Sequence, residues 1–340
     1  MFFHGLFYYL KTQIIMDELI QNQKIEETIK RILKKEKTQL SIGVILNGKI
    51  KIFKYNDGNP KYYDIGSISK VFTSLMILKA QDEGLLNIYD EIDKYIELKS
   101  GKYPKIKDLL SHRTGYFFTT PLRITIPGIF KRYSRKNIYQ NIKKEDVVSS
   151  IERIGYRSEK YGYSDFSYAL LSLIIENVYN NSFIEVFNSF IEELELTETK
   201  TIDNNFLRKD SYLFNKKINN WVWNNNPYIA SGGIASTIVD MSNFLLKLMS
   251  KKEDYIKESF LILNEHKKHN YSFFLSKNHH VYTHIGGVGT FRSSISINPK
   301  RKIGIVVLSN SIGRRRGNVS YLNKMIYYFI RRNKIRINFD

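Results

Sequence analysis

Apolar residues follow two different spacings in the N-terminal part of the chain. Two strand-like runs, Leu40 to Leu46 and Lys49 to Phe53, are joined by Asn47-Gly48. This dipeptide tolerates the positive φ angles of a type I′ turn, so we predict a β-hairpin. The segment before this hairpin, from Met16 to about Lys35, is predicted to form an amphipathic helix. Its apolar residues recur at helical spacing, at Leu19, Ile20, Ile25, Ile29, Ile32 and Leu33.

The middle of the chain has mainly helical patterns. Ile68 to Gln81 is largely apolar, which predicts a buried central helix that ends near Gly84. No repeat or low-complexity linker interrupts the region from Leu85 to about Phe214, so we interpret it as a helical insert. Its helical patterns cover Ile106 to Ser111, Glu145 to Ile151, Tyr168 to Tyr179 and Phe183 to Leu194.

Strand patterns return after Trp221. We expect a tight turn at Ser231 to Ile234, a helix from Ser236 to Leu248 and a closing helix from Val319 to Arg332. Between these two helices we expect three strands, at His280 to His284, Phe291 to Ile297 and Ile303 to Leu308. Asn298-Pro299 marks the turn between the second and the third.

Strands near both ends with helices between them predict an α+β fold. Its antiparallel sheet would be assembled from the two termini and flanked by helices, with a mostly helical domain inserted. The predicted division is a leader of uncertain role at 1–15, an α/β sandwich domain from 16–64 and 220–340, and a mostly helical domain at 65–219.

Composition narrows the possible classes of protein. The 340 residues are 42% hydrophobic, enough for a large core, and the absence of cysteine excludes disulfide scaffolds and thiolate metal sites. The 53 Lys and Arg against 33 Asp and Glu give a net charge of +20. Basic pairs such as Lys34-Lys35 are scattered and only Arg314-Arg315-Arg316 is a tight cluster, so we expect no nucleic-acid partner.

The first fifteen residues do not have the pattern of a secretion signal, because they lack a basic start and a small-residue cleavage site. Met16 looks like a natural helix start, so this segment is interpreted as an extension or the result of a misplaced start codon. No later run reaches the ~18 apolar residues of a membrane span. We expect a cytoplasmic protein, with membrane attachment through Phe2 to Leu10 as the alternative.

The strongest chemical signal is Ser67-Ile68-Ser69-Lys70. Three residues are nearly one helical turn, so the Ser67 hydroxyl and the Lys70 ammonium would share a face at a helix start. A neighbouring amine can take the hydroxyl proton and convert an unreactive serine into a nucleophile. Alone the spacing is a weak signal, and a polar pair capping a core helix is the alternative.

Three further segments follow in order. The first, Ile106 to Gly115, contains Ser111-His112-Arg113-Thr114-Gly115. The second, Tyr163-Ser164-Asp165, precedes a helical pattern. The third, His284-Ile285-Gly286-Gly287, ends a strand pattern. With these motifs the chain resembles the serine β-lactamase and penicillin-binding protein superfamily, in the branch of class C β-lactamases, D-alanyl-D-alanine carboxypeptidases, D-aminopeptidases and related esterases. The resemblance covers roughly Ser41 to Asn310.

The resemblance implies a role for each motif. Ser67 would form the acyl-enzyme, Lys70 would hold its proton balance, and Tyr163 would relay the proton to the leaving group and activate water. Because an ordinary tyrosine titrates near ~10, this role would require a lowered phenol pKa beside the ammonium. The backbone N–H groups of Ser67 and Gly287 would form the oxyanion hole, and a strand edge from His284 would hold the substrate. Ser111 to Gly115 matches a signature that is more often structural.

Two positions depart from the family pattern. His284-Ile285-Gly286 stands where β-lactamases have Lys-Thr-Gly, and a histidine there resembles the peptidase and D-amino-acid branches. Asp165 stands where asparagine is commoner. A carboxylate cannot donate a hydrogen bond to a substrate carbonyl as an amide does, and it could pair with Lys70. Substrate preference is therefore less well specified than mechanism.

Other interpretations of the same residues are weaker. His279, His280 and His284 could suggest a metal site, but no Cys, Asp or Glu in that stretch completes a ligand set. Gly286 to Gly289 lacks the spacing of a dinucleotide loop. Trp221 and Trp223 would line the cleft or belong to the core. We expect neither metal nor cofactor, and the sequence does not specify an oligomeric state.

The predicted function is that of a serine hydrolase that cleaves an amide of a small molecule or short peptide, as a D-amino-acid peptidase or carboxypeptidase. A carboxylesterase or β-lactamase of the same fold is the alternative within the class. A catalytically silent binding module that keeps the fold is the alternative outside it, suggested by Asp165, His284 and the positive charge.

Overall fold

A computed structural model of the chain describes residues 12–34, 37–56, 58, 61–116, 137–202, 208–213, 216–224, 226–264, 269–270, 274–276, 280–312 and 318–337. Its largest element is an antiparallel sheet of eight strands in the order β2-β1-β13-β12-β11-β10-β9-β8. The strands are β1 (Leu40–Leu46), β2 (Lys49–Tyr55), β8 (Ile262–Asn264), β9 (His269–Asn270), β10 (Phe274–Ser276), β11 (Val281–Val288), β12 (Phe291–Asn298) and β13 (Ile303–Ser309).

The sheet joins the two ends of the chain, as the sequence predicted. Strand β1 pairs with β2 on one side and with β13 on the other, with Leu40 opposite Ser309. The Asn47-Gly48 turn has positive φ at both residues (52° and 80°), which confirms the predicted hairpin. The α+β fold with a sheet built from both termini is therefore confirmed.

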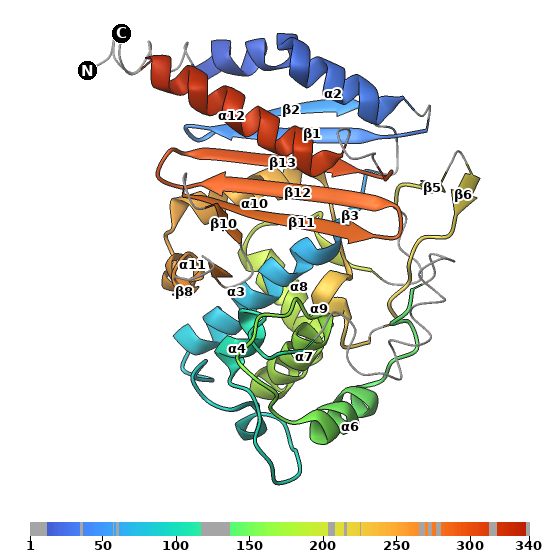
Figure 1. Ribbon diagram of the computed structural model, residues 1–340, viewed down its shortest axis with the longest axis vertical. Helices are drawn as coiled ribbons and strands as arrows, with labels where there is room; N and C mark the ends of the chain where they lie inside the picture. Colours follow the sequence, from blue (N-terminus) through green and yellow to red (C-terminus); the bar gives the residue numbers. More distant parts are fainter. Residues whose placement is uncertain are drawn as a thin grey trace.

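Helices cover both faces of the sheet (Figure 1). On the outer face residues 12–18, the short turn η1 (Leu19–Gln21), α2 (Gln23–Leu33) and α12 (Val319–Ile337) pack through a core that includes Ile25, Val44, Ile305 and Ile326. On the inner face α10 (Ile238–Ser250) lies directly against the sheet, and the larger core continues below it.

The region below the sheet is mostly helical. Its centre is α3 (Ser69–Asp82), which is buried along nearly its whole length and therefore shows no amphipathic pattern. Around it lie η3 (Ile92–Lys94), α4 (Ile106–Leu110), α6 (Lys144–Ile154), α7 (Asp165–Tyr179), α8 (Phe183–Glu193), α9 (Ile229–Gly232) and α11 (Asp254–Ser259). Two small sheets complete the structure, β3 (Tyr63–Asp64) with β7 (Ile234–Ser236) and β4 (Lys200–Thr201), and β5 (Ser211–Leu213) with β6 (Lys216–Ile218).

Three local predictions were wrong. The expected helix from Met16 starts earlier and is broken at Asn22, whose side chain accepts a hydrogen bond from the Ile25 N–H and caps α2 instead. The expected tight turn at Ser231 to Ile234 contains the end of α9 and the start of β7. The strand at His284 continues through both glycines to Val288.

Some predictions lie outside the described residues, namely most of the leader with Phe2 to Leu10, and the cluster Arg314-Arg315-Arg316. The domain boundaries at 64 and 219 stay predictions. Among the helices in the described ranges, none combines the length and the hydropathy that crossing a bilayer requires.

Candidate active site

Ser67 lies in a short turn that joins β3 to the central helix. The turn η2 (Gly66–Ile68) runs directly into α3, so Ser67 stands just before the helix start. Ser67 is partly exposed, whereas its neighbours Gly66 and Ile68 are buried. A β-carbon on Gly66, whose φ is +54°, would stand 2.6 Å from the amide nitrogen of Gly287. Glycine is required here because the turn touches strand β11.

A buried ion pair holds the strand that precedes this turn. The Arg208 guanidinium donates to the Asp64 carboxylate at 2.6 Å and, through its other terminal nitrogen, to the Trp221 carbonyl oxygen at 2.8 Å. Both charged side chains are almost fully buried. Burial raises the pKa of Asp64, while the charge of Arg208 and the hydrogen bond from it lower that pKa. Since a buried pair adds little net stability, its contribution is to fix β3 against the Trp221 segment.

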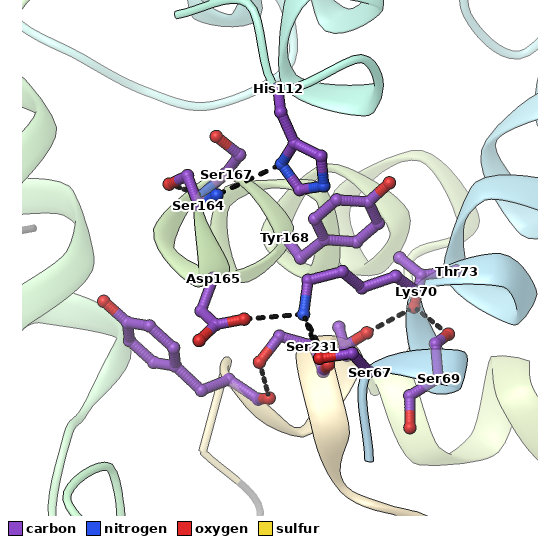
Figure 2. A network of polar contacts seen from close by, with 12 residues as sticks. Ser67, Ser69, Lys70, Thr73, His112, Ser164, Asp165, Ser167, Tyr168 and Ser231 are labelled. Carbon is purple, nitrogen blue, oxygen red and sulfur yellow. Dashed lines mark hydrogen bonds and ion pairs between the residues drawn. The ribbon is translucent and has the colours of Figure 1, made fainter. Parts of the chain in front are cut away.

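Lys70 lies one turn after Ser67 and is fully buried. Its Nζ is 3.4 Å from the Ser67 Oγ, 2.6 Å from the Asp165 Oδ1 and 2.7 Å from the Ser231 carbonyl oxygen (Figure 2). The ammonium therefore has three oxygen partners around it. The predicted proximity of Ser67 and Lys70 and the predicted pairing of Asp165 with Lys70 are both present.

Asp165 is placed by the start of helix α7. Ser164 caps this helix by accepting a hydrogen bond from the Ser167 N–H, which leaves Asp165 as the first helical residue. One carboxylate oxygen accepts from Lys70 and the other accepts from the Tyr139 hydroxyl at 2.8 Å. Because both oxygens are occupied within the protein, Asp165 is oriented toward Lys70.

Tyr163 stands beside Lys70 and Ser67. The Lys70 Nζ lies 5.0 Å from the centre of its ring, and the ring of His112 is 4.5 Å away on centroids. Removal of the phenol from water raises the pKa of Tyr163 well above 10, and the charge of Asp165 raises it further. A hydrogen bond from Ser67 acts in the opposite direction. The expected lowering of the Tyr163 pKa was therefore wrong, because desolvation and the Asp165 carboxylate together outweigh the hydrogen bond from Ser67.

Strand β11 packs against the turn that carries Ser67. Gly286 is buried, and a side chain there would collide with the Ile65 carbonyl oxygen. Gly287 is exposed. In the described part of the chain β10 pairs only with residues 281 to 283 of β11, so the outer edge from His284 onward carries no described strand. The backbone of Gly287 thus borders both the Ser67 turn and this edge.

His284 is buried at the start of that edge, where its Nδ1 donates to the Ile285 carbonyl oxygen at 3.2 Å. Burial lowers the pKa of His284 to about 3, and the charge of Lys70 contributes in the same direction. The hydrogen bond to Ile285 opposes this shift. The imidazole is therefore neutral at neutral pH, unlike the lysine found at this place in β-lactamases.

This lowered pKa predicts acid sensitivity. Between pH 6.5 and about 3 the unfolded chain binds a proton at His284 that the folded chain does not, so the free energy of unfolding falls as the pH falls. At pH 5 the loss is about 2 kcal/mol relative to pH 7. Urea unfolding at both pH values should show that His284→Gln removes this part of the pH dependence. The same change at the exposed His280 should not; an equal effect there would contradict the assignment.

Several residues near the site were not identified from the sequence as its members. Tyr139 is one of 24 tyrosines and nothing in its neighbourhood marks it as a partner of Asp165. Ser231 contributes a backbone oxygen, which no residue type predicts. His112 accepts a hydrogen bond from the Ser164 N–H at 3.2 Å and packs on Tyr163, consistent with a structural signature. Only His112 had a sequence signal, through the motif that contains it.

The structure describes some of the residues behind the alternative interpretations, namely the two tryptophans and part of the histidine group. Trp223 is buried in the core. Trp221 lies beside the Gly289 turn, where its Nε1 would be 3.6 Å from a β-carbon placed on Gly289. His279 lies outside the described residues. Among described residues no group of three or more His, Cys, Asp or Glu side chains is placed to hold a metal ion.

Known proteins are similar to this chain over much of its length. The beta-lactamase family model matches residues 26–322. Protein flp of Staphylococcus aureus (strain MRSA252) is 28% identical over 310 residues, which cover 79% of this chain and 59% of that protein. Teichoic acid D-alanine hydrolase of the same strain is 27% identical over 232 residues, covering 62% of this chain and 54% of that protein. The chain thus spans less than two thirds of the length of these relatives.

The fold has solved counterparts. A beta-lactamase/D-alanine carboxypeptidase from Pseudomonas syringae superposes with a TM-score of 0.73 at 15% identity, covering 92% of this chain and 98% of that one. At this identity the likeness concerns the fold alone.

Proposed function

Because the chain belongs to the beta-lactamase family of serine hydrolases, we propose that it cleaves an amide bond beside a D-amino acid through a covalent acyl-enzyme on Ser67. One observation carries the proposal. Ser67 is partly exposed, stands 3.4 Å from the buried Lys70 ammonium and hydrogen-bonds to the Tyr163 phenol. A serine with a cation and a proton carrier beside it has the surroundings of an activated nucleophile.

The protonated phenol supports a proton relay through Tyr163. As the Ser67 Oγ attacks the substrate carbonyl carbon, its proton passes to the Tyr163 oxygen, which gives its own proton to the leaving nitrogen. The C–N bond then breaks, and Tyr163 remains a neutral phenol throughout. This relay uses the state that a raised pKa maintains at neutral pH. The Lys70 ammonium stabilises the negative charge that develops on Oγ.

The substrate carbonyl oxygen would lie between two backbone N–H groups, those of Ser67 and Gly287. The contact between the Gly66 turn and the Gly287 amide supports this placement. The open edge of β11 from His284, with Gly286 packed on the turn, would bind an extended substrate by backbone hydrogen bonds. Water would then reach the acyl-enzyme by the same route, with Tyr163 relaying its proton to the Ser67 Oγ.

The D-amino-acid preference rests on the relatives and on His284. A teichoic acid D-alanine hydrolase and a D-alanine carboxypeptidase are among the proteins similar to this chain. The neutral His284 places no positive charge where β-lactamases carry a lysine. Both features favour D-alanyl compounds over β-lactam antibiotics.

A carboxylesterase is the second candidate, and Asp165 favours it. The family's asparagine can donate to an acylamide carbonyl of the substrate, whereas both Asp165 oxygens accept hydrogen bonds from Lys70 and Tyr139. An ester that lacks an acylamide group does not need this donor.

The test is a substrate panel of D-alanyl and L-alanyl p-nitroanilides, the matching p-nitrophenyl esters and a chromogenic cephalosporin. Preferential cleavage of the D-alanyl amide is expected. Preferential cleavage of the esters, whether D-alanyl or L-alanyl, would support the carboxylesterase. If nothing in the panel is cleaved and a fluorophosphonate does not react, while D-alanyl peptides bind saturably, the chain is a binding module. A cytoplasmic location also remains a proposal, which subcellular fractionation tests.

Replacing Tyr163 with phenylalanine should slow acylation by about 10²- to 10⁴-fold, because the relay loses its hydroxyl. The ring remains to pack on His112 and to face Lys70, so the variant should stay folded. The rate of fluorophosphonate labelling measures the effect. Tyr161→Phe is the matched control, since that ring also approaches His112 but lies farther away, at 6.3 Å. Near-normal labelling of Tyr163→Phe would contradict the relay.

A further inference from the structure

The last part of the chain carries positive charge without any negative charge. Between Glu265 and Asp340 the sequence has no aspartate or glutamate, and the described elements β11, β12, β13 and α12 all fall in this stretch. Protein surfaces normally intersperse both signs of charge. Where such a stretch is exposed, its charge attracts an anionic partner.

Helix α12 presents a basic and aromatic face to solvent. Tyr321, Lys324, Tyr328 and Arg332 recur at intervals of three and four residues and are all exposed, so they form one stripe, here called the α12 face. The tyrosines are 39% and 40% exposed. Lys324 lies over the Tyr328 ring at 5.8 Å. Neither Lys324 nor Arg332 forms a salt bridge with any residue that the structure describes.

The opposite side of α12 fixes this orientation. Its buried residues include Leu322, Ile326 and Ile330, and the Asn323 side chain donates to the carbonyl oxygens of Ser294 and Ile305 at 3.0 and 3.2 Å. These contacts hold the helix flat on the sheet, so the α12 face cannot turn inward without breaking them.

The neighbouring helix does not neutralise the α12 face. Helix α2 packs beside α12, where the Thr28 hydroxyl contacts the Met325 sulfur at 3.4 Å. Its carboxylates, Glu26 and Glu27, pair with Lys30 and Arg31 of the same helix. Lys24 and Lys34 add further exposed positive charge. With Asp17 and Glu18, residues 12–34 carry four acidic and four basic side chains, so their charges balance. The net positive charge of the layer that α2 and α12 form on the outer side of the sheet (Figure 1) therefore comes from α12.

We propose that this layer, formed by residues 12–34 and α12, docks on an anionic phospholipid bilayer with the α12 face at the headgroups. Lysine and arginine are attracted to anionic headgroups, and tyrosine favours the region between headgroups and acyl chains. In the sequence, the aromatic and apolar residues from Phe2 to Leu10 come just before the first residue of this layer, Thr12.

Docking in this way leaves the candidate active site accessible. Ser67 lies in the turn that leads into α3 on the inner side of the sheet, whereas the layer lies on the outer side. A docked molecule would hold its candidate active site close to a membrane without blocking it. The substrate would then be one that reaches the membrane surface.

The test is co-sedimentation of the full chain with vesicles of phosphatidylglycerol and phosphatidylcholine in equal parts, and with pure phosphatidylcholine vesicles. Binding to the anionic vesicles alone is expected, and added salt should weaken it. Lys324→Gln/Arg332→Gln should lower the affinity about 25-fold, since each basic residue near such a surface contributes about fivefold. Tyr321→Ser/Tyr328→Ser should weaken binding without changing the net charge. All variants should keep wild-type fluorophosphonate labelling, which shows that they are folded.

The control, Arg153→Gln/Lys160→Gln, removes the same amount of charge elsewhere in the molecule. Both residues are exposed, belong to the helical region and are far from the layer in the sequence. This control should bind vesicles as the wild type does. Equal loss in the control would mean that only net charge matters, and would overturn the proposal. So would binding to pure phosphatidylcholine, no binding to anionic vesicles, or preferential binding to a DNA duplex, which would assign the surface to nucleic acid.

Discussion

Replacing Ser67 with alanine is expected to abolish covalent labelling by a fluorophosphonate and to lower turnover of any substrate by on the order of 10⁶-fold. The reason is local, because the Ser67 Oγ is the atom that stands beside Lys70 and Tyr163. Lys70 keeps its bonds to Asp165 and the Ser231 carbonyl, so the variant should fold. Mass spectrometry of the intact protein and of its peptides measures the adduct and its position.

Ser69→Ala is the matched control for this experiment. Ser69 is buried two residues further on, and its hydroxyl accepts a hydrogen bond from the Ile234 N–H at 3.3 Å. Losing that bond should cost about 1 kcal/mol of stability and leave labelling intact. An adduct that persists in Ser67→Ala, or one that disappears only in Ser69→Ala, would place the nucleophile elsewhere.

The sequence predicted those parts of the fold that local patterns determine. Asn47-Gly48 specified its turn because few dipeptides accept two positive φ angles, and the buried strand β13 was visible as a continuous apolar run. The Ser67 and Lys70 pair was also predictable, since both lie within one turn of the same element. Each of these features depends on residues that are close in the sequence.

Features that depend on distant residues were harder to predict. The break at Asn22 needs only a capping side chain, which a hydrophobic pattern does not register. The raised pKa of Tyr163 was missed because it depends on the balance between desolvation, Asp165 and the hydrogen bond from Ser67, and three-dimensional distances decide that balance. Arg208 and Tyr139 carry no motif, and only the fold brings them to Asp64 and Asp165.

Replacing Lys70 with methionine should lower the acylation rate on the order of 10³-fold, because the developing charge on the Ser67 Oγ loses its cation. It should also destabilise the protein by about 3–5 kcal/mol, since the buried Asp165 carboxylate is left without its ammonium partner. A loss of activity in this variant could therefore reflect unfolding. Urea unfolding together with fluorophosphonate labelling separates the two effects only if a second variant restores the fold.

The double variant Lys70→Met/Asp165→Asn provides this separation. It removes both charges of the pair, while the amide oxygen introduced in place of the carboxylate can still accept the hydrogen bond from the Tyr139 hydroxyl. Its stability should return close to that of the wild type, because no isolated charge remains buried, whereas acylation should stay slow. If acylation recovered together with stability, Lys70 would serve only to neutralise Asp165, and Tyr163 alone would have to activate Ser67.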